Sequence, residues 1–376
     1  MTRILIYELK KIFSLPVCVL WAAVVAILIA VSAGRYGTFT SMHGLPAAGV
    51  RSISMEYAGP LDQALADRAL ADWRALPNDW YNPDPPETQA RRSVLRTLDE
   101  EFQAAAGLEE SQPPNGASAD AAARLAPMLR ADYAPFVHGY WEGWRALLAA
   151  FGSEAAWLCA VMAAFGASAL FSGEGAAAMA ACVRTTRHGR GTLALGKLVA
   201  AAAYGLISAA VCFGLPMIVC AALFGLQGGG LPAQYAAGYD SQIAYPLTLA
   251  QLAGLQAAMG ALGALALALC TGVLSAAMAS VTTPAVAAMA LFAAPTIAAM
   301  LKLASPALDC VLRYAPSRLL LPMPLLKELH AAQLWQGALW QPAWLCTLWA
   351  AALPLLGWAA ARLWQRVARQ EPVSQD

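Results

Sequence analysis

The chain has 376 residues, of which 59% are hydrophobic and 12% are charged, and its formal net charge is +1. A soluble domain usually carries about 25% charged residues, so this composition excludes an ordinary soluble domain and indicates an integral membrane protein. The near-zero charge gives no indication of nucleic-acid binding. The eight cysteines show no CxxC or CxxH spacing and the four histidines no paired spacing, so we expect no metal site.

The first 33 residues combine an amphipathic stretch with an apolar run. In residues 1–13 the apolar side chains can share one helical face, and the other face is expected to carry Arg3, Glu8, Lys10 and Lys11. This pattern favours a helix lying in the membrane interface, although a simple basic flank of the first span fits as well. Residues 14–33 are predicted to be that span (TM1), with the N-terminus in the cytoplasm.

The character of the chain changes in residues 34–147, which hold ten Arg, no Lys and fifteen acidic residues. Apolar residues recur there at helical spacing, for example at Val94, Leu95 and Leu98, as in a surface helix with one apolar stripe. We therefore predict a mostly helical extracytoplasmic domain. Two roles stay open for it: a ligand-binding module, or a cap that packs on the spans or on a partner subunit.

Residues 148–172 form the predicted second span (TM2). Glu154 lies near its start, and an acidic residue within a membrane segment is a candidate for function. We therefore treat Glu154 as a candidate translocation or gate residue. The alternative is a hydrated carboxylate close to the interface.

The stretch from Phe171 to Lys197 is the most basic part of the apolar region. It carries one acid followed by four cations, namely Glu174, Arg184, Arg187, Arg190 and Lys197. Segments rich in Lys and Arg stay on the cytoplasmic side of a membrane, so residues 173–192 are predicted to be a cytoplasmic segment with an Ala-rich helical start. Its cations either dock a partner protein, or only fix the topology and contact lipid headgroups.

The rest of the chain contains four more predicted spans. They are residues 193–225 (TM3), 247–270 (TM4), 284–301 (TM5) and 342–363 (TM6), with an outer loop at 226–246, an inner loop at 271–283 and a cytoplasmic tail at 364–376. Pro216 and Pro295 are further gate candidates, because proline kinks a helix. Residues 302–341 are too apolar for a solvated loop and too rich in proline for one span, so we expect re-entrant or interfacial helices there.

The predicted fold is an all-α integral membrane protein with six transmembrane helices and a large, mostly helical extracytoplasmic domain between the first and the second. Both termini are then cytoplasmic, which satisfies the positive-inside rule at the two ends and at the basic segment. Neither a catalytic constellation nor a GxxxxGK[ST] phosphate loop is present in the sequence. We therefore expect no catalytic residues, no cofactor and no binding of ATP by this chain itself.

Two sequence features resemble the permease subunits of type-2 ATP-binding-cassette (ABC) exporters, particularly six-span bacterial permeases with a large outer domain. The first is YELKKIFSLP at residues 7–16. The second follows TM2 and comprises Phe171, Glu174, Arg184, Thr185, Thr186, Arg187, His188, Gly189, Arg190 and Lys197. In such permeases this segment is a coupling helix that docks on the ATPase subunit. The resemblance therefore implies docking through Glu174, Arg184, Arg187, His188, Arg190 and Lys197.

The resemblance also implies a function and a location. It implies a dimer with a second permease copy or a paralogue in the bacterial cytoplasmic (inner) membrane, in contact with lipid. The dimer would export a hydrophobic or amphipathic substrate, using ATP hydrolysed by a separate ABC ATPase subunit. The alternative is a membrane sensor or assembly protein whose outer domain binds a ligand and whose basic loop binds a cytoplasmic regulator.

Overall fold

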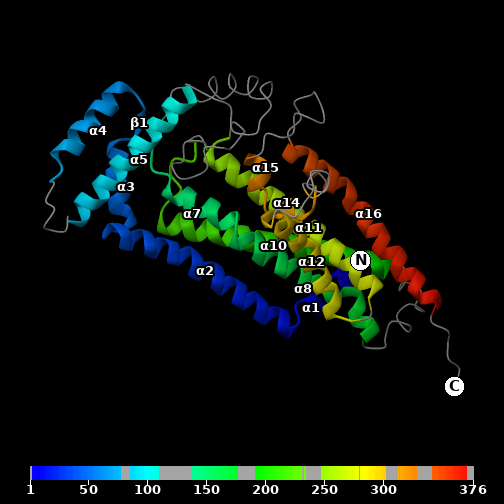
Figure 1. Cartoon of the computed structure of the whole chain (residues 1–376). Helices are drawn as coiled ribbons and strands as arrows, with labels where there is room; N and C mark the ends of the chain where they lie inside the picture. Colours follow the sequence, from blue (N-terminus) through cyan, green and yellow to red (C-terminus); the bar gives the residue numbers. More distant parts are fainter. Residues whose placement is uncertain are drawn as a thin grey trace.

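The computed structural model describes residues 2–77, 85–109, 137–176, 191–230, 233, 247–278, 280–301, 312, 314–327 and 341–370. Most of these residues are helical, as the composition predicts. Figure 1 shows a bundle of long helices with a small helical domain at one end, beyond the end of the long helix α2.

The bundle is built from α1 (Thr2–Ile12), α2 (Leu15–His43), α7 (Glu142–Phe151), α8 (Glu154–Ala176), α10 (Thr192–Leu223), α11 (Leu249–Ala277), α12 (Thr282–Met300) and α16 (Gln341–Gln370). Within the part of the chain that the structure describes, five stretches are long and apolar enough to cross a membrane: Leu15–Thr38, Glu142–Glu174, Thr192–Leu223, Leu249–Ala277 and Pro342–Gln365. The apolar helix at Thr282–Ala298 is shorter. The chain therefore has the build of a multi-pass membrane protein.

Helices α8 and α11 form the centre of the bundle. The apolar window of α7 and α8 is 72% buried and that of α11 is 61% buried, against 17% for α2 and 11% for α16. The outer helices therefore turn apolar side chains outward, which is favourable only where lipid rather than water surrounds them.

Small residues let the central helices approach one another closely. A Cβ atom on Gly166 would lie 2.0 Å from the ring of Tyr204, and one on Gly260 would lie 2.4 Å from the ring of Phe213. Because lipid is as apolar as the helices, van der Waals contact at such positions drives helix association in membranes. These glycines thus fix where α10 meets α8 and α11.

The end domain comprises α3 (Ala47–Glu56), α4 (Gln63–Ala75), α5 (Pro86–Glu109) and a two-stranded antiparallel pair, β1 (Gly59–Pro60) with β2 (Val137–His138). Its own small core is made of Val50, Ile53, Tyr57, Ala90, Val94, Leu95 and Leu98. The predicted apolar stripe on α5 is thereby confirmed, since its three residues are all buried. Asp62 caps α4 by accepting a hydrogen bond of 2.8 Å from Leu65 N.

Several helix ends differ from the predicted boundaries. The helix α2 runs ten residues past residue 33, α11 runs to Ala277 in the predicted inner loop, and α16 runs to Gln370 in the predicted tail. Hydropathy locates only the apolar part of a helix, whereas the backbone hydrogen bonds of the helix continue until a helix-breaking residue. For α2 that breaker is Gly44, whose φ of 63° ends the right-handed turn, followed by Pro46.

Two short helices occupy the described part of the proline-rich segment 302–341. They are α14 (Ser317–Leu320) and α15 (Met323–Lys327), and their leucines Leu319, Leu320, Leu325 and Leu326 are buried. A Cβ atom on Gly263 would lie 2.9 Å from Leu319 and from Leu320, so α14 sits directly on α11. Residues 302–311, 313 and 328–340 lie outside the described residues.

Candidate functional site

The charged residues on either side of the basic segment meet in the interior of the bundle. Arg184, Arg187, His188 and Arg190 lie outside the described residues, but Glu174 closes α8 and Lys197 opens α10. Glu174 is 8% exposed and Lys197 is fully buried. Both side chains are therefore paired with other charges inside the chain, and the docking role that the resemblance implies for them stays a prediction.

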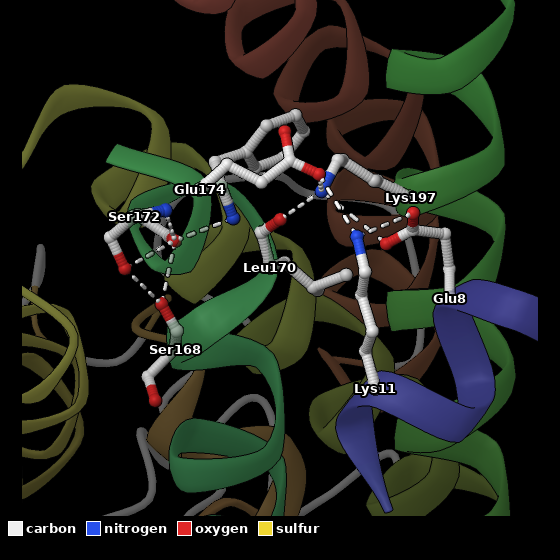
Figure 2. Close-up of polar contacts among 9 residues, drawn as sticks. Glu8, Lys11, Ser168, Leu170, Ser172, Glu174 and Lys197 are labelled. Atoms are coloured by element: carbon white, nitrogen blue, oxygen red, sulfur yellow. Dashed lines mark hydrogen bonds and ion pairs between the residues drawn. The ribbon is translucent and has the colours of Figure 1, made fainter. Parts of the chain in front are cut away.

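Glu174 and Lys197 belong to a four-residue ion cluster with Glu8 and Lys11 of α1 (Figure 2). Lys197 Nζ lies 2.8 Å from Glu174 and 3.3 Å from Glu8. Lys11 Nζ lies 3.1 Å from Glu174 and 3.3 Å from Glu8. Each carboxylate thus contacts both ammonium groups, and the cluster joins α1, α8 and α10 into one unit.

The cluster is electrically balanced, with two carboxylates and two ammonium groups. Burial lowers the pKa of Lys11, but the hydrogen bonds and charges of Glu174 and Glu8 outweigh it and raise that pKa above its ordinary value. Lys197 also donates a hydrogen bond to the carbonyl of Leu170. A buried charge is tolerated only when it is paired and hydrogen-bonded, and Lys197 meets both conditions.

Glu8 corrects the predicted orientation of the N-terminal helix. It was assigned to the polar face, yet it is only 1% exposed. The reason is its spacing: Glu8 lies four residues from both Ile4 and Ile12, and residues four apart share one face of a helix. That face packs on α8 and α10, where Glu8 meets Lys197.

Close to the ion cluster, the backbone of α8 is bonded to a side chain from α11. The hydroxyl of Ser275 accepts from the N–H groups of Phe171 and Ser172 at 3.1 and 3.0 Å and donates to the carbonyl of Ser168 at 2.6 Å. A side chain inserted in a helical ladder marks a point where the helix bends easily. The last two turns of α8 are therefore cross-linked to α11 at a place of the kind where helices bend.

Glu154 lies at the opposite end of α8, in an ion pair with Arg35 of α2. Arg35 Nη2 lies 2.9 and 2.8 Å from the two carboxylate oxygens of Glu154, and its Nη1 donates to the carbonyl of Ala146 at 2.9 Å. Both carboxylate oxygens of Glu154 are therefore bound by the guanidinium group of Arg35. The Arg35–Glu154 pair fastens α2 to the break between α7 and α8 at Gly152 and Ser153.

The two charged sites are separated by roughly the thickness of a membrane. Glu154 and Glu174 are twenty residues apart on one helix, which corresponds to about 30 Å at about 1.5 Å per residue. The hydrocarbon core of a bilayer is also about 30 Å thick. Each ion site can thus lie at one membrane interface, with apolar helix between them.

Pro216 is buried inside α10 and Pro295 inside α12. Each lacks an N–H and so interrupts the helical ladder, but neither adds a charge or a donor to a site. Among the described residues there is no group of three or more side chains able to hold a metal ion.

Comparison with protein-family models, with curated proteins and with solved structures finds no match to this chain. Four side chains of the sites described above are not predicted by the sequence as site residues, namely Glu8, Lys11, Arg35 and Ser275. For Arg35 a signal existed, since it is a lone cation at the end of an apolar run. No comparable signal existed for Ser275, because its partners lie more than 100 residues away in the sequence.

Proposed function

We propose that this chain is the membrane-spanning permease subunit of an ABC transporter. It dimerises with a second copy or a paralogue and exports a hydrophobic or amphipathic solute, with ATP hydrolysed by a separate subunit. The observation that carries the proposal is the ion cluster. It ties α1, α8 and α10 together where α8 and α10 join the predicted cytoplasmic segment 173–192, which is the segment that resembles a coupling helix.

The proposed topology has six spans with both termini in the cytoplasm. The sixth span is α12, which has 19 residues and reaches about 28 Å at about 1.5 Å per residue, close to the hydrocarbon thickness of about 30 Å. The ion cluster then lies at the cytoplasmic interface of the inner membrane. The Arg35–Glu154 pair and the end domain lie at the opposite face, in agreement with the basic segment being inside.

The ion cluster would serve as the mechanical joint. When two ATPase subunits close on ATP, they displace the basic segment, and a segment moves its neighbours only if it is firmly attached to them. The bonds among Glu8, Glu174 and Lys197 supply that attachment, and Ser275 extends it to α11. The bending point at the end of α8 lets the segment tilt without unfolding the span.

The Arg35–Glu154 pair would act as the opposite gate. It holds α2 against the α7–α8 break, so separation of these elements requires the pair to open. Both side chains are partly exposed, at 26% and 33%, so water can solvate them when they part. The cost of opening is therefore small, about 1 kcal/mol or less for a surface-like ion pair, which suits a contact that breaks in every transport cycle.

The docking role can be tested by purifying the tagged protein from native membranes in mild detergent. We expect an ATPase with a Walker-type phosphate loop to co-purify with the wild type and to be lost from the double variant Arg187→Glu/Arg190→Glu. The matched control is Arg68→Glu/Arg74→Glu, which reverses two exposed charges on α4 in the end domain and should retain the ATPase.

The joint can be tested separately with Glu174→Gln/Lys197→Met, which removes one acid and one base together. We expect this variant to retain the ATPase subunit but to lose most of the substrate-stimulated ATP hydrolysis. If no ATPase co-purifies with the wild type, the permease proposal fails and the sensor alternative takes its place.

A further inference from the structure

The end domain contains a hydrogen-bonded chain of a serine, a histidine and a glutamate. Ser54 Oγ lies 3.2 Å from Nε2 of His138, and Nδ1 of His138 lies 2.6 Å from Glu101. All three side chains are buried, being 6%, 2% and 3% exposed. They come from three elements, α3, β2 and α5, so no local sequence motif predicts this arrangement.

Glu101 has a second hydrogen-bond partner besides His138. Its second oxygen accepts a hydrogen bond of 2.9 Å from Trp141 Nε1, and an indole can only donate. An ionised Glu101 then requires His138 to donate from Nδ1, which leaves Nε2 as the acceptor for the hydroxyl of Ser54. This is the tautomer that a histidine needs in order to act as base toward a serine hydroxyl.

The hydroxyl of Ser54 is directed away from its own helix. Serine in a helix commonly bonds back to a carbonyl of the preceding turn, and Ser52 on the same helix does so, donating to Gly49 at 2.8 Å. Ser54 instead reaches His138, which β1 and β2 hold in place through the pairing of Gly59 with His138. The contact between serine and histidine thus depends on the tertiary fold.

A pocket gives access to the serine and the histidine. It is a small, half-open pocket whose lining includes Ser54, His138, Tyr140, Trp141 and Glu142. The pocket wall includes the start of α7, where the first N–H groups of a helix have no partner within the helix. N–H groups of this kind can stabilise a negatively charged oxygen that forms beside a serine nucleophile.

We propose that Ser54 is the nucleophile of an ester-hydrolysing site in the end domain, with His138 as its general base and Glu101 as the residue that positions the imidazole. The side chain of Glu142 in the pocket wall disfavours substrates that carry a carboxylate, and it favours the departure of the acid product. This site is independent of the proposed transport function.

The reaction proceeds in two balanced steps. Ser54 Oγ attacks the ester carbonyl carbon, its proton passes to Nε2 of His138, and the bond to the alcohol oxygen breaks as that alcohol takes the proton from the imidazolium. Water then attacks the acyl group on Ser54 with the same base. The carboxylic acid leaves and the free serine is regenerated.

The test uses the purified full chain in detergent, a fluorophosphonate probe and p-nitrophenyl acetate. We expect mass spectrometry of the wild type to place the probe on Ser54, a measurement that needs no variant. Ser54→Ala should lose the label, and His138→Gln should slow ester hydrolysis by about 100-fold or more, as removal of a general base does. The matched control is Ser52→Ala on the same helix, whose hydroxyl bonds to Gly49 instead of His138, and this variant should label and hydrolyse as the wild type does.

Two results would overturn the proposal. One is a wild-type protein that takes up no probe at Ser54. The other is a Ser54→Ala variant that keeps the wild-type rate of ester hydrolysis, which would assign that rate to a contaminant or to another residue.

Discussion

The substitution Lys197→Met tests whether the ion cluster is the joint of the bundle. Methionine keeps most of the length and volume of lysine but removes the ammonium group. Glu174 then loses a partner at 2.8 Å, Glu8 loses one at 3.3 Å, and the carbonyl of Leu170 loses its donor. Two buried carboxylates remain with one ammonium group, that of Lys11.

The size of the effect follows from the charge that is left unpaired. Removing one partner of a buried ion pair costs about 3–5 kcal/mol, and one lost hydrogen bond adds about 1 kcal/mol. Lys11 is 41% exposed and still contacts both carboxylates, so the excess charge is partly compensated. We therefore expect a loss at the lower end of that range, on the order of 3 kcal/mol in the free energy of unfolding.

The assay is SDS-induced unfolding in mixed micelles, followed by tryptophan fluorescence. The informative comparison is Glu174→Gln/Lys197→Met, which leaves one carboxylate and one ammonium group. We expect the two single variants each to be destabilised and the double variant to recover on the order of 1–3 kcal/mol of their summed loss. Lys10→Met is the matched control, because Lys10 is an exposed lysine on α1, and it should change the free energy by less than about 0.5 kcal/mol.

The ion cluster is not the joint of the bundle if Lys197→Met is no more destabilising than Lys10→Met. It is also refuted if the losses from Lys197→Met and Glu174→Gln simply add in the double variant. Additive losses would mean that the two side chains are not coupled, whatever their separation.

Three further predictions concern other parts of the fold. Gly166→Ala should destabilise the bundle by about 1–3 kcal/mol in thermal or SDS unfolding, because its Cβ would enter a tyrosine ring of α10, whereas Gly214→Ala, with nothing within 4 Å, should cost nothing. Glu154→Gln should lower the free energy of unfolding by about 1 kcal/mol or less. It should also increase the distance between Arg35 and α8, which crosslinking can detect. Burial and a hydrogen bond to an aspartate raise the pKa of Tyr57. The neutral phenol therefore stabilises the fold below its ordinary pKa of about 10, and this stabilisation is lost as the pH rises through the raised pKa. Tyr57→Phe should remove this loss in unfolding curves measured between pH 9 and about 11.

Much of the helical architecture was accessible from the sequence. Apolar runs of the right length predict membrane helices without knowledge of their neighbours, since a span must satisfy its own backbone and bury its own length. The stripe at Val94, Leu95 and Leu98 likewise predicts the buried face of α5, because helical periodicity is a local property. The basic segment can also be recognised locally, because it is a run of charged residues between two apolar stretches.

The candidate sites were only half visible from the sequence. Glu154, Glu174 and Lys197 stand out as charges in or beside apolar runs, but the sequence does not show which residues they pair with. Arg35 lies 119 residues from Glu154, and Glu8 lies 189 residues from Lys197. Nothing in a single sequence pairs residues at such separations.

Hydropathy and periodicity act over a few turns of one helix, so they are enough to identify a helical membrane protein with a polar helical insertion and a strongly basic segment. The burial of Glu174 and Lys197 with Glu8, and the hydrogen-bonded chain of Ser54, Glu101 and His138, become apparent only in the folded molecule. Those arrangements depend on how α1, α8 and α10, or α3, α5 and β2, pack against one another. Packing depends on the shapes of all the elements together. A charged residue that the sequence predicts to be at the surface can therefore be buried and paired in the interior.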